Sequence, residues 1–483
     1  MIDPIARHAQ ARPGASALLA PSGTWTYAAL DGVISQGHRA LHSIGIGAGV
    51  RVGVHRPRTA ETVALLWALW RVGAVAVPLS TRLPPAEVGR HARHAGCDHL
   101  VTGDAAVAES APDVVAVHAP DTFHGGKTSS GDAGGVGSAG GRPLDRPATI
   151  LYTSGSTGTP KAVLHTWAQH VYSAKGANAN MPLGAGDRWV LSLPLYHVGG
   201  LAVLLRCALA GAAVVVASPE AALPGTLRHR SATHASMVAT QFRRVLDATE
   251  GPPPPSLRGV LLGGGPIPGP LLDRGRARGW PIHTSYGCTE MGSQVTTTAP
   301  GAPRSALATA GRRLPHRRLR VEDGQILVAG RPLCEGYVTA EGLVDPRTED
   351  GWYATGDRGR LDAQGRLHVL GRVDRMFISG GENIQPEEIE KALEQVSGVE
   401  RAVVVPVTDT EYGARPVAYV DGSAPGPDEA LRRALGAVLP SFKIPDAFHP
   451  LPPPDGPGPL KIDRDRLRRR AHKLHGLDPP DDT

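Results

Sequence analysis

The chain has 483 residues, of which 41% are hydrophobic and 20% are charged, and its formal net charge is +6. This length and composition are those of a soluble globular protein with one large and one small domain. The modest positive charge could favour anionic nucleotide substrates. Because aromatic residues make up only 4% and no basic stripe alternates with them, the composition argues against a nucleic-acid-binding protein.

The cysteines and the apolar runs indicate the cellular compartment of the protein. Four cysteines lie far apart in the sequence, which is typical of reduced thiols. They are Cys97, Cys207, Cys288 and Cys334. The most apolar run, residues 63–79, contains Arg71 and is interrupted by Pro78, so no membrane span is expected. The chain opens without a signal-peptide pattern, and we therefore expect a cytoplasmic protein.

The first 120 residues alternate between helical and strand patterns. A helix is predicted over residues 60–72, a strand over 74–78 and a second helix over 85–95. Strands separated by helices of this length indicate βαβ units and a parallel sheet. Residues 124–141 are rich in glycine and serine and lack apolar anchors, which predicts a mobile surface linker.

One group of potential metal ligands lies near the end of the second helix. Its members are His91, His94, Cys97 and His99. They fall where the predicted helix gives way to a strand over residues 100–102. We interpret them as exposed helix residues rather than as a zinc site.

The most informative stretch is 152–161, YTSGSTGTPK, which follows a predicted buried strand over 148–152. Gly155 and Gly158 allow backbone N–H groups to point into one concavity, where the hydroxyl groups and Lys161 add donors. Such a cradle suits the polyphosphate of a nucleotide. It is not a Walker A loop, because its lysine lies between proline and alanine. Taken alone, the stretch could also be a flexible, solvated loop.

Three later strands also end in turns that could bind a ligand. The strand over 188–193 leads to a turn with His197, and the strand over 260–262 leads to three glycines. A flat ring such as adenine could lie against this bare backbone, although a tight strand-to-helix turn explains the glycines equally well. A third strand ends in polar residues 285–290. Ligands collect at the carboxyl ends of parallel strands, so these turns and the stretch 152–161 predict one site.

From residue 351 onward the pattern becomes that of a small α+β unit. The predicted elements are a hairpin over 359–370, a helix from 386, strands over 402–407 and 416–420, and a helix over 428–438. We place the domain boundary between residues 371 and 372, which gives an N-terminal domain 1–371 and a C-terminal domain 372–483. The arginine-rich stretch 464–473 is interpreted as a solvated helix face.

The stretch 152–161 resembles the phosphate-binding signature of the adenylate-forming enzymes, the family of acyl-CoA synthetases, peptide-synthetase adenylation domains and luciferases. The resemblance extends from Trp25 to Lys461. It implies a large α/β N-terminal domain, with mixed and parallel sheets flanked by helices, and a small mobile α+β C-terminal domain. It also implies that a carboxylic acid, ATP with Mg²⁺, and CoA bind to the protein and react through an acyl-adenylate.

The resemblance further implies roles for individual residues. The phosphates of ATP would be held by Thr153, Ser154, Gly155, Ser156, Thr157, Gly158 and Lys161. Adenine and ribose would be held by Gly263, Gly264, Gly265, Ser285, Tyr286, Gly287, Asp357 and Arg372. Thr289 would contact the α-phosphate, and Glu290 would be the magnesium ligand. Lys461 would be the mobile catalytic lysine, and His197 would line the site for the acid.

In the C-terminal domain, the resemblance implies a hinge at Asp374. Rotation about this hinge would withdraw Lys461 and bring the loop of Ser379, Gly380 and Gly381 to line a tunnel for the CoA thiol. Two positions depart from the family pattern. Leu460 and Ala162 each stand where glycine is usual.

Residues 193–200, 262–266 and 285–294 resemble, more narrowly, the family of o-succinylbenzoate–CoA ligases of menaquinone biosynthesis. Arg206 lies in an otherwise apolar stretch, and a buried arginine needs an anionic partner. That partner could be the second carboxylate of a dicarboxylic substrate, with Gln294 adding polar contacts, or an acid of the protein itself.

Other functions stay open at this point. The alternatives are another aryl- or fatty-acyl-CoA ligase and a stand-alone adenylation enzyme that loads a carrier protein. A catalytically silent nucleotide-binding protein is disfavoured because both Lys461 and Glu290 are present. The sequence leaves the oligomeric state open, a homo-oligomer included.

Overall fold

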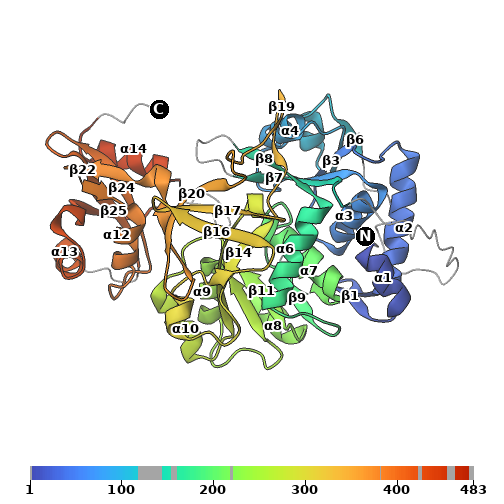
Figure 1. Cartoon of the computed structure of the whole chain (residues 1–483), viewed down its shortest axis with the longest axis horizontal. Helices are drawn as coiled ribbons and strands as arrows, with labels where there is room; N and C mark the ends of the chain where they lie inside the picture. Colours follow the sequence, from blue (N-terminus) through green and yellow to red (C-terminus); the bar gives the residue numbers. More distant parts are fainter. Residues whose placement is uncertain are drawn as a thin grey trace.

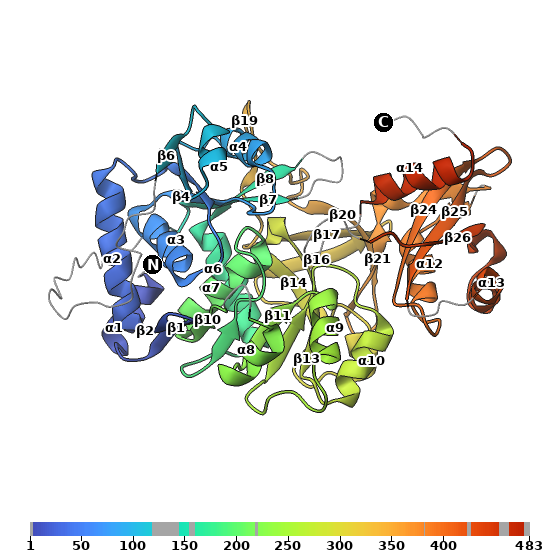
Figure 2. The same ribbon diagram turned by 180° about the vertical axis from the view of Figure 1, so that it is seen from behind.

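The computed structural model describes residues 3–117, 144–153, 160–217, 221–380, 382–422, 427–453 and 463–477. A large domain carries a small C-terminal domain at one end (Figure 1, Figure 2). The predicted linker 124–141 lies outside the described residues. Within the described ranges, no helix is both long and apolar enough to cross a membrane.

An eight-stranded sheet forms one half of the large domain. Its strands are, in spatial order, β19 (Gly342–Val344), β18 (Gly336–Thr339), β8 (Lys161–Thr166), β7 (Pro147–Thr153), β4 (Val75–Pro78), β3 (Arg51–His55), β5 (His99–Thr102) and β6 (Val115–Val117). Strands β3, β4, β5 and β6 are parallel, and α3 (Ala60–Val72) and α4 (Pro85–His94) connect them as predicted. At its other edge the sheet becomes antiparallel, because β7 pairs with β8 and β8 with β18.

A nine-stranded sheet forms the other half. Its strands are β15 (Arg312–Arg313), β14 (Ser293–Thr297), β13 (Ile282–Cys288), β12 (Gly259–Leu262), β11 (His234–Met237), β9 (Arg188–Val190), β10 (Ala213–Val215), β1 (Ser16–Ala20) and β2 (Gly23–Thr26). The central strands β9 to β13 are parallel, and β14 returns antiparallel to β13.

One layer of helices packs between the two large sheets. It contains α3, α6 (Trp167–Asn180) and α7 (Val198–Ala210), whose apolar residues share one core with strands of both sheets. A helix covered on two sides needs no polar face, which explains why residues 63–70 of α3 are apolar around the whole circumference. The outer face of the nine-stranded sheet is covered by α9 (Ala239–Asp247) and α10 (Gly269–Ala277). The outer face of the eight-stranded sheet is covered by α4.

A third sheet links the large domain to the small one. Its strands are β16 (Arg317–Glu322), β17 (Gln325–Gly330), β20 (Tyr353–Leu361) and β21 (Leu367–Arg372), all antiparallel to their neighbours. The last two strands form the hairpin that the sequence predicted. The predicted domain boundary between residues 371 and 372 falls at the end of β21 and stays a prediction.

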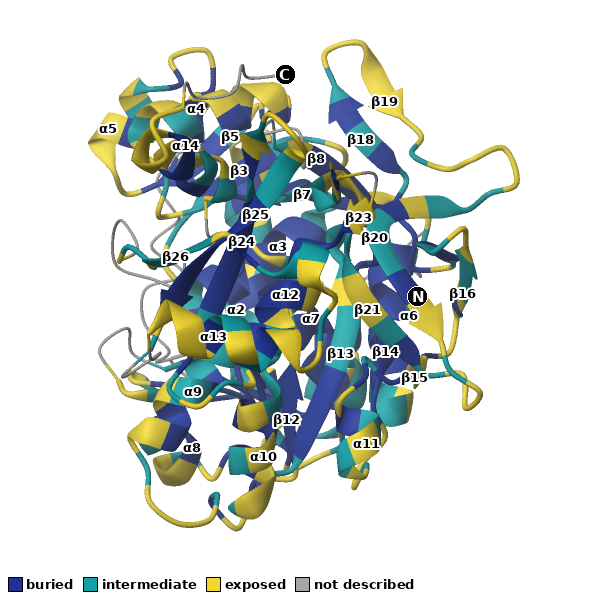
Figure 3. Cartoon of the chain, turned by 90° about the vertical axis from the view of Figure 1, so that its left-hand side faces the viewer, coloured by how far each residue is buried: buried dark blue, intermediate teal, exposed yellow. Residues whose placement is uncertain are grey.

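The small domain is an α+β unit, as predicted. It contains a two-stranded ribbon, β22 (Phe377–Ser379) and β23 (Glu382–Ile384), and a sheet of β24 (Arg401–Asp409), β25 (Gly413–Asp421) and β26 (Ala447–Pro450). Helices α12 (Pro386–Leu393) and α13 (Asp428–Gly436) cover one face of the sheet, and α14 (Arg464–Leu474) covers the other. Strands β24 and β25 are therefore mostly buried (Figure 3). Arg243 of α9 contacts this domain, because its Nη1 lies 2.9 Å from Oε2 of Glu400.

Two predictions of exposed residues were wrong in part. His91 is buried and its ring stacks on Tyr152 at a centroid distance of 4.1 Å, because α4 packs against β7. Cys97 is buried as well. Within the described ranges, no three His, Cys, Asp or Glu residues are grouped so that they could hold a metal ion. Arg464 does not belong to a solvated face, because its Nη1 lies 2.6 Å from Oε1 of the buried Glu390.

Arg317 connects β16 to α6 and β14 and is only 1% exposed. Its Nε donates to the carbonyl of Gln294 at 2.8 Å, and its Nη2 donates to the carbonyl of Ser173 at 2.9 Å. Nη1 donates to the carbonyl of Pro315 at 2.9 Å. Backbone carbonyls thus solvate this cation in place of water. Gly176 of α6 makes room for it, since a Cβ there would lie 2.0 Å from Nη1 of Arg317.

We expect Gly176→Ala to destabilise the protein, although alanine is the better helix former by about 1 kcal/mol. The added methyl group would displace Arg317 from its carbonyl partners, and overpacking of this kind should leave a net loss of about 1–2 kcal/mol. Urea unfolding measures the change. Gly184→Ala is the control, because a Cβ at Gly184 meets no atom within 4 Å. Equal stability of both variants and the wild type would contradict the role given to Arg317.

Candidate active site

The predicted site residues come from all three sheets of the large domain, and two side-chain bridges bring them together. The Tyr286 hydroxyl at the end of β13 donates to Oδ2 of Asp357 in β20 at 2.7 Å. The Tyr337 hydroxyl in β18 donates to Oε1 of Glu290 at 2.8 Å. Seven predicted residues lie outside the described residues: Ser154, Gly155, Ser156, Thr157, Gly158, Gly381 and Lys461.

The phosphate-loop residues that the structure describes belong to a β-hairpin. β7 runs parallel to β4 but pairs antiparallel with β8, so that Thr153 lies opposite Lys161. The stretch between them therefore follows a strand that is parallel to β4, as the sequence pattern suggested, and leads into an antiparallel neighbour. Lys161 is exposed, and its Nζ lies 5.0 Å from the centre of the Tyr337 ring. Its ammonium group is available to an anion in front of the hairpin.

The glycine turn follows β12, as predicted, and lies beside β13. Gly264 has φ +81°, a left-handed conformation that glycine adopts without strain. At Gly263 a Cβ would lie 2.6 Å from Oγ of Ser285, whose hydroxyl donates to the carbonyl of Leu262 at 2.9 Å. Gly265 is exposed and has open space around it. The turn therefore presents bare backbone at the carboxyl end of the sheet, where a flat ring can lie.

Asp357 and Arg372 are cross-strand partners in β20 and β21. Burial raises the pKa of Asp357, and the bonds from Tyr286 and Arg372 partly oppose this shift. Nη1 of Arg372 lies 3.3 Å from Oδ1 of Asp357, while its Nη2 lies 2.9 Å from Oδ2 of Asp374. The predicted ribose anchors and the predicted hinge residue thus form one chain of ion pairs. Each carboxylate oxygen of Asp357 keeps a lone pair that can accept a hydrogen bond from a hydroxyl group.

Glu290 lies in a short 3₁₀ helix, Thr289–Met291, directly after β13. Its side chain is 6% exposed, and no lysine or arginine among the described residues forms an ion pair with it. A buried carboxylate without a basic partner suits a metal cation, and a single carboxylate together with phosphate oxygens suits Mg²⁺. Thr289 comes just before it and is partly exposed on the same turn.

Arg206 lies in α7 and is 1% exposed. Its Nη2 donates to Oγ of Ser293 at 3.1 Å, and its guanidinium lies 5.3 Å from the centre of the Trp189 ring. Nε and Nη1 are buried without hydrogen-bond partners, and no acidic residue pairs with Arg206 in the described part of the chain. Burial lowers its pKa to about 10. The alternative of a salt bridge to a protein acid therefore finds no support.

Gln294 lies next to the residue that Arg206 contacts. Its Nε2 donates to Oγ1 of Thr297 at 2.5 Å, while its buried Oε1 has no partner. Ser293 has φ +119°, which residues other than glycine rarely adopt. Strained backbone, an orphan acceptor and orphan donors occur together here, which is a common property of ligand sites.

His197 and Arg206 occupy different ends of one helix. His197 is the exposed residue that precedes α7, whereas Arg206 lies in its last two turns. Nine residues of helix separate them by about 13 Å along the axis. The two predicted acid-binding residues therefore do not touch each other, and they would contact different parts of a substrate.

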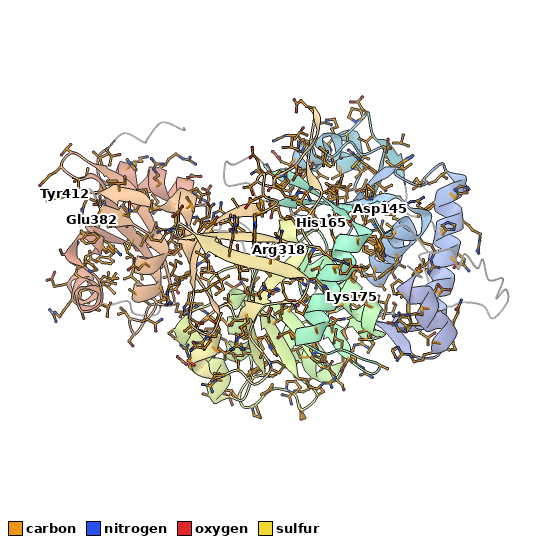
Figure 4. The ribbon with its side chains drawn as sticks, in the orientation of Figure 1. Asp145, His165, Lys175, Arg318, Glu382 and Tyr412 are labelled. Carbon is orange, nitrogen blue, oxygen red and sulfur yellow. The ribbon has the colours of Figure 1, made fainter. Side chains whose placement is uncertain are left out.

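The predicted thiol-tunnel loop lies in the small domain (Figure 4, where Tyr412 and Glu382 are labelled). Ser379 is buried, and its Oγ accepts a hydrogen bond from Nη1 of Arg415 at 3.3 Å. Gly380 has φ +57°, and its N–H donates to the carbonyl of Tyr412 at 2.8 Å. The turn requires glycine at this position because the chain adopts the left-handed conformation there.

Sequence reasoning missed three residues of the site: Tyr337, Arg317 and His165. Tyr337 contacts Glu290 and Lys161 together, but it lies 47 residues after the first of these. Arg317 stands among other arginines, so its burial had no distinct signal. His165 directly follows the apolar run 162–164 in β8, and its place at the end of a buried strand could have indicated a buried histidine.

His165 packs below the turn that carries Glu290. It is completely buried, its ring stacks on that of His170 at 5.0 Å, and a Cβ at Gly292 would lie 3.9 Å from its Cδ2. Both ring nitrogens lack hydrogen-bond partners among the described residues. Burial lowers the pKa of His165 to about 4, so the ring is neutral at pH 7. Figure 4 shows the residue inside the large domain.

Comparison with known proteins identifies the family. A family model described as AMP-binding enzyme matches residues 5–342, and one described as AMP-binding enzyme C-terminal domain matches residues 388–453. The chain belongs to the AMP-binding enzyme family. The resemblance drawn from the sequence is thus confirmed.

Two curated relatives of this AMP-binding enzyme have the same name. The 2-succinylbenzoate–CoA ligase of Bacillus cereus is 34% identical over 418 residues, which are 84% of this chain and 85% of the relative. The 2-succinylbenzoate–CoA ligase of Listeria monocytogenes is 29% identical over 463 residues, which are 95% of this chain and 97% of the relative.

Solved structures confirm the fold of this AMP-binding enzyme. The o-succinylbenzoate CoA synthetase of Bacillus subtilis in complex with its acyl-adenylate intermediate is 29% identical, with a TM-score of 0.86 over 97% of this chain and 98% of that one. The same synthetase in complex with ATP and a magnesium ion is 30% identical, with a TM-score of 0.82 over 93% of this chain and 96% of that one.

The burial of His165 predicts a specific loss of stability in acid. An unfolded histidine has a pKa of about 6.5, so the unfolded state binds a proton between pH 6.5 and 4 that folded His165 does not bind. Stability therefore falls as the pH is lowered through this range. His165 alone should contribute a loss of about 2 kcal/mol between pH 7 and pH 5.

Urea unfolding at pH 7 and pH 5 measures this contribution in the wild type and in His165→Gln. We expect the variant to lose less stability than the wild type between the two pH values. An identical pH dependence of the two proteins would show that His165 is not held neutral.

Proposed function

We propose that this AMP-binding enzyme is a 2-succinylbenzoate–CoA ligase. It joins 2-succinylbenzoate to CoA, with cleavage of ATP to AMP and pyrophosphate, in the pathway to menaquinone. It is an AMP-forming acyl-CoA ligase, and relatives of this name match most of its length. The observation that carries the choice of acid is Arg206, a buried guanidinium with two orphan donor atoms and no acidic partner in the described chain.

In the first half-reaction, the carboxylate of the acid attacks the α-phosphorus of ATP and pyrophosphate leaves. Two anions must approach each other, so neutralising charge and fixing the line of attack supply most of the catalysis. Lys161 and Thr153, with the loop between them, would hold the β- and γ-phosphates, and Thr289 would contact the α-phosphate. Mg²⁺ bound by Glu290 would neutralise charge on the phosphate oxygens. Lys461 would add its cation at the reacting carboxylate.

The nucleoside would lie across the carboxyl ends of β12 and β13. The turn of Gly263, Gly264 and Gly265 offers bare backbone to the adenine ring. The carboxylate of Asp357, held by Tyr286 and Arg372, would accept hydrogen bonds from the ribose hydroxyls. Ser285 and Gly287 would complete the wall between these two groups.

In the second half-reaction, the CoA thiol attacks the carbonyl carbon of the adenylate and AMP leaves. Lys461 cannot stay in the site while the pantetheine arm enters, so the small domain has to rotate. Asp374 would be the hinge, and Ser379, Gly380 and Gly381 would line the thiol path. The four cysteines are free thiols, which fits a reaction in the cytoplasm, where ATP and CoA are available.

The acid itself has two carboxylates, which must bind at different positions in the site. The aliphatic one must meet the α-phosphate, so the aromatic one must be held in the acyl pocket. Arg206 would hold the aromatic carboxylate, directly or through water, and Gln294 would add a polar contact. His197, at the other end of α7, would line the opposite part of the acid site.

We expect Arg206→Leu to impair turnover of 2-succinylbenzoate far more than turnover of the monocarboxylate 4-phenyl-4-oxobutanoate. Loss of a charge-assisted hydrogen bond of this kind should cost about 1.5–3 kcal/mol, or roughly ten- to a hundredfold in kcat/KM. Steady-state kinetics with both acids measures the difference. The thermal midpoint should not fall, because no acid among the described residues loses its partner.

Arg71→Leu is the matched control for this experiment. Arg71 is also mostly buried, but its Nε lies 2.9 Å from Oδ2 of Asp3 and its Nη2 lies 2.6 Å from Oδ1 of Asp31. We expect this variant to lose stability without changing the preference between the two acids. Equal losses with both acids in Arg206→Leu, or a wild type that prefers the monocarboxylate, would overturn the dicarboxylate assignment.

We expect Lys461→Ala to abolish most adenylate formation while sparing thioester formation from a supplied acyl-adenylate. The lysine stabilises charge only in the first half-reaction, and loss of such a group costs about 10²–10³ in rate. Pyrophosphate exchange measures the first half, and acyl-CoA release from the adenylate measures the second. Lys473→Ala, an exposed lysine of α14, is the control. Equal losses in both halves would refute the assignment of Lys461 to the first step.

A further inference from the structure

Tyr337 contacts two charged residues of the predicted ATP site, Glu290 and Lys161. Its hydroxyl donates to Oε1 of Glu290 at 2.8 Å, and its ring lies 5.0 Å from Nζ of Lys161. Glu290 is buried, and its Oε2 accepts no hydrogen bond from the described residues. One carboxylate oxygen is therefore occupied by a protein donor, and the other is left for a different ligand.

The register of the eight-stranded sheet determines this position. Tyr337 of β18 lies directly opposite Val163 of β8, and Lys161 is two residues before Val163. Side chains two residues apart in a strand share one face of the sheet, so Lys161 is a diagonal neighbour of Tyr337. A shift by one residue would turn Tyr337 to the other face and separate it from both groups.

A second tyrosine extends the hydrogen-bond chain that ends at Glu290. The hydroxyl of Tyr353, in β20, lies 3.1 Å from that of Tyr337. Tyr337 has a single hydroxyl hydrogen, which it donates to Glu290, so Tyr353 must donate to Tyr337. Hydrogen bonds in such a chain polarise one another and strengthen the terminal bond to the carboxylate.

We propose that Tyr337 is a positioning residue that restricts Glu290 to ligation through one oxygen and thereby favours magnesium over calcium. The inference rests on the proposed function, in which Glu290 binds the metal that accompanies ATP. Mg²⁺ takes a carboxylate through one oxygen and keeps several waters, whereas Ca²⁺ accepts both oxygens of a carboxylate in a larger, flexible shell. A donor on Oε1 stabilises the first arrangement and opposes the second.

The test compares metal-dependent ATP binding by the full chain with and without this hydroxyl. Isothermal titration calorimetry gives the Kd of ATP in the presence of Mg²⁺ and, separately, of Ca²⁺, with neither acid nor CoA present. For Tyr337→Phe we expect the Kd with Mg²⁺ to rise by about tenfold, as is common when a residue behind a metal ligand is removed. The Kd with Ca²⁺ should rise by less than about threefold, because the freed oxygen can ligate calcium.

Tyr27→Phe is the matched control. Tyr27 is buried in the large domain and its hydroxyl also makes a hydrogen bond, to the carbonyl of Ala212 at 2.9 Å, but it does not contact Glu290. This variant should lose a similar amount of thermal stability and keep the wild-type ratio of the two dissociation constants. A purely structural role of Tyr337 would change both constants by the same factor, and that result would overturn the inference.

Two further outcomes separate this inference from the proposed function. If the wild type binds ATP equally well with and without metal, Glu290 is not a metal ligand and both proposals fail. If binding depends on Mg²⁺ but Tyr337→Phe leaves both constants unchanged, only the present inference fails. If Tyr337→Phe does not fold, the same titrations are made with Tyr353→Phe, which removes the donor to Tyr337. In that variant, a Kd with Mg²⁺ that rises by less than about twofold overturns the inference.

Discussion

The site depends on charged side chains that are buried without a counter-ion among the described residues. Arg206 has a serine hydroxyl and an indole ring as its partners, and Glu290 has a tyrosine hydroxyl. Buried charges of this kind are costly unless an opposite charge compensates them. In the function that we propose, the substrates supply that compensation, as a carboxylate at the arginine and a cation with ATP at the glutamate. The free enzyme thus already contains buried charges that ionic ligands can neutralise.

The scaffold keeps these charges in place by joining three sheets around them. Tyr286 and Asp357 connect the nine-stranded sheet to the four-stranded one, and Tyr337 and Glu290 connect it to the eight-stranded one. Arg317 adds a rigid support beneath the segment that carries Gln294, because five N–H groups in a planar fork bind carbonyls and a hydroxyl of two elements. Several tertiary contacts therefore hold the proposed metal, ribose and acid sites in one geometry.

Local sequence patterns were sufficient for elements whose environment follows from their own residues. The helix predicted over 60–72 has the same bounds as α3, because an apolar stretch of this length between two strands is typical of a buried crossover helix. The β20–β21 hairpin followed from its turn. His91 and Arg464 were misjudged, since each is polar and its burial depends on a partner distant in sequence: the Tyr152 ring for the first and Glu390 for the second.

By itself, the sequence determined the alternation of helices and strands, the family and the residue types that adenylate chemistry requires, because these depend on local periodicity and on short motifs. Only the tertiary structure decided which charges meet. It showed that Arg206 has no acidic partner among the described residues, that Arg317 is solvated by backbone carbonyls, and that Tyr337 reaches Glu290 from another sheet. The physical reason is that burial and counter-ions are properties of packing between segments distant in the chain, which local pattern does not encode.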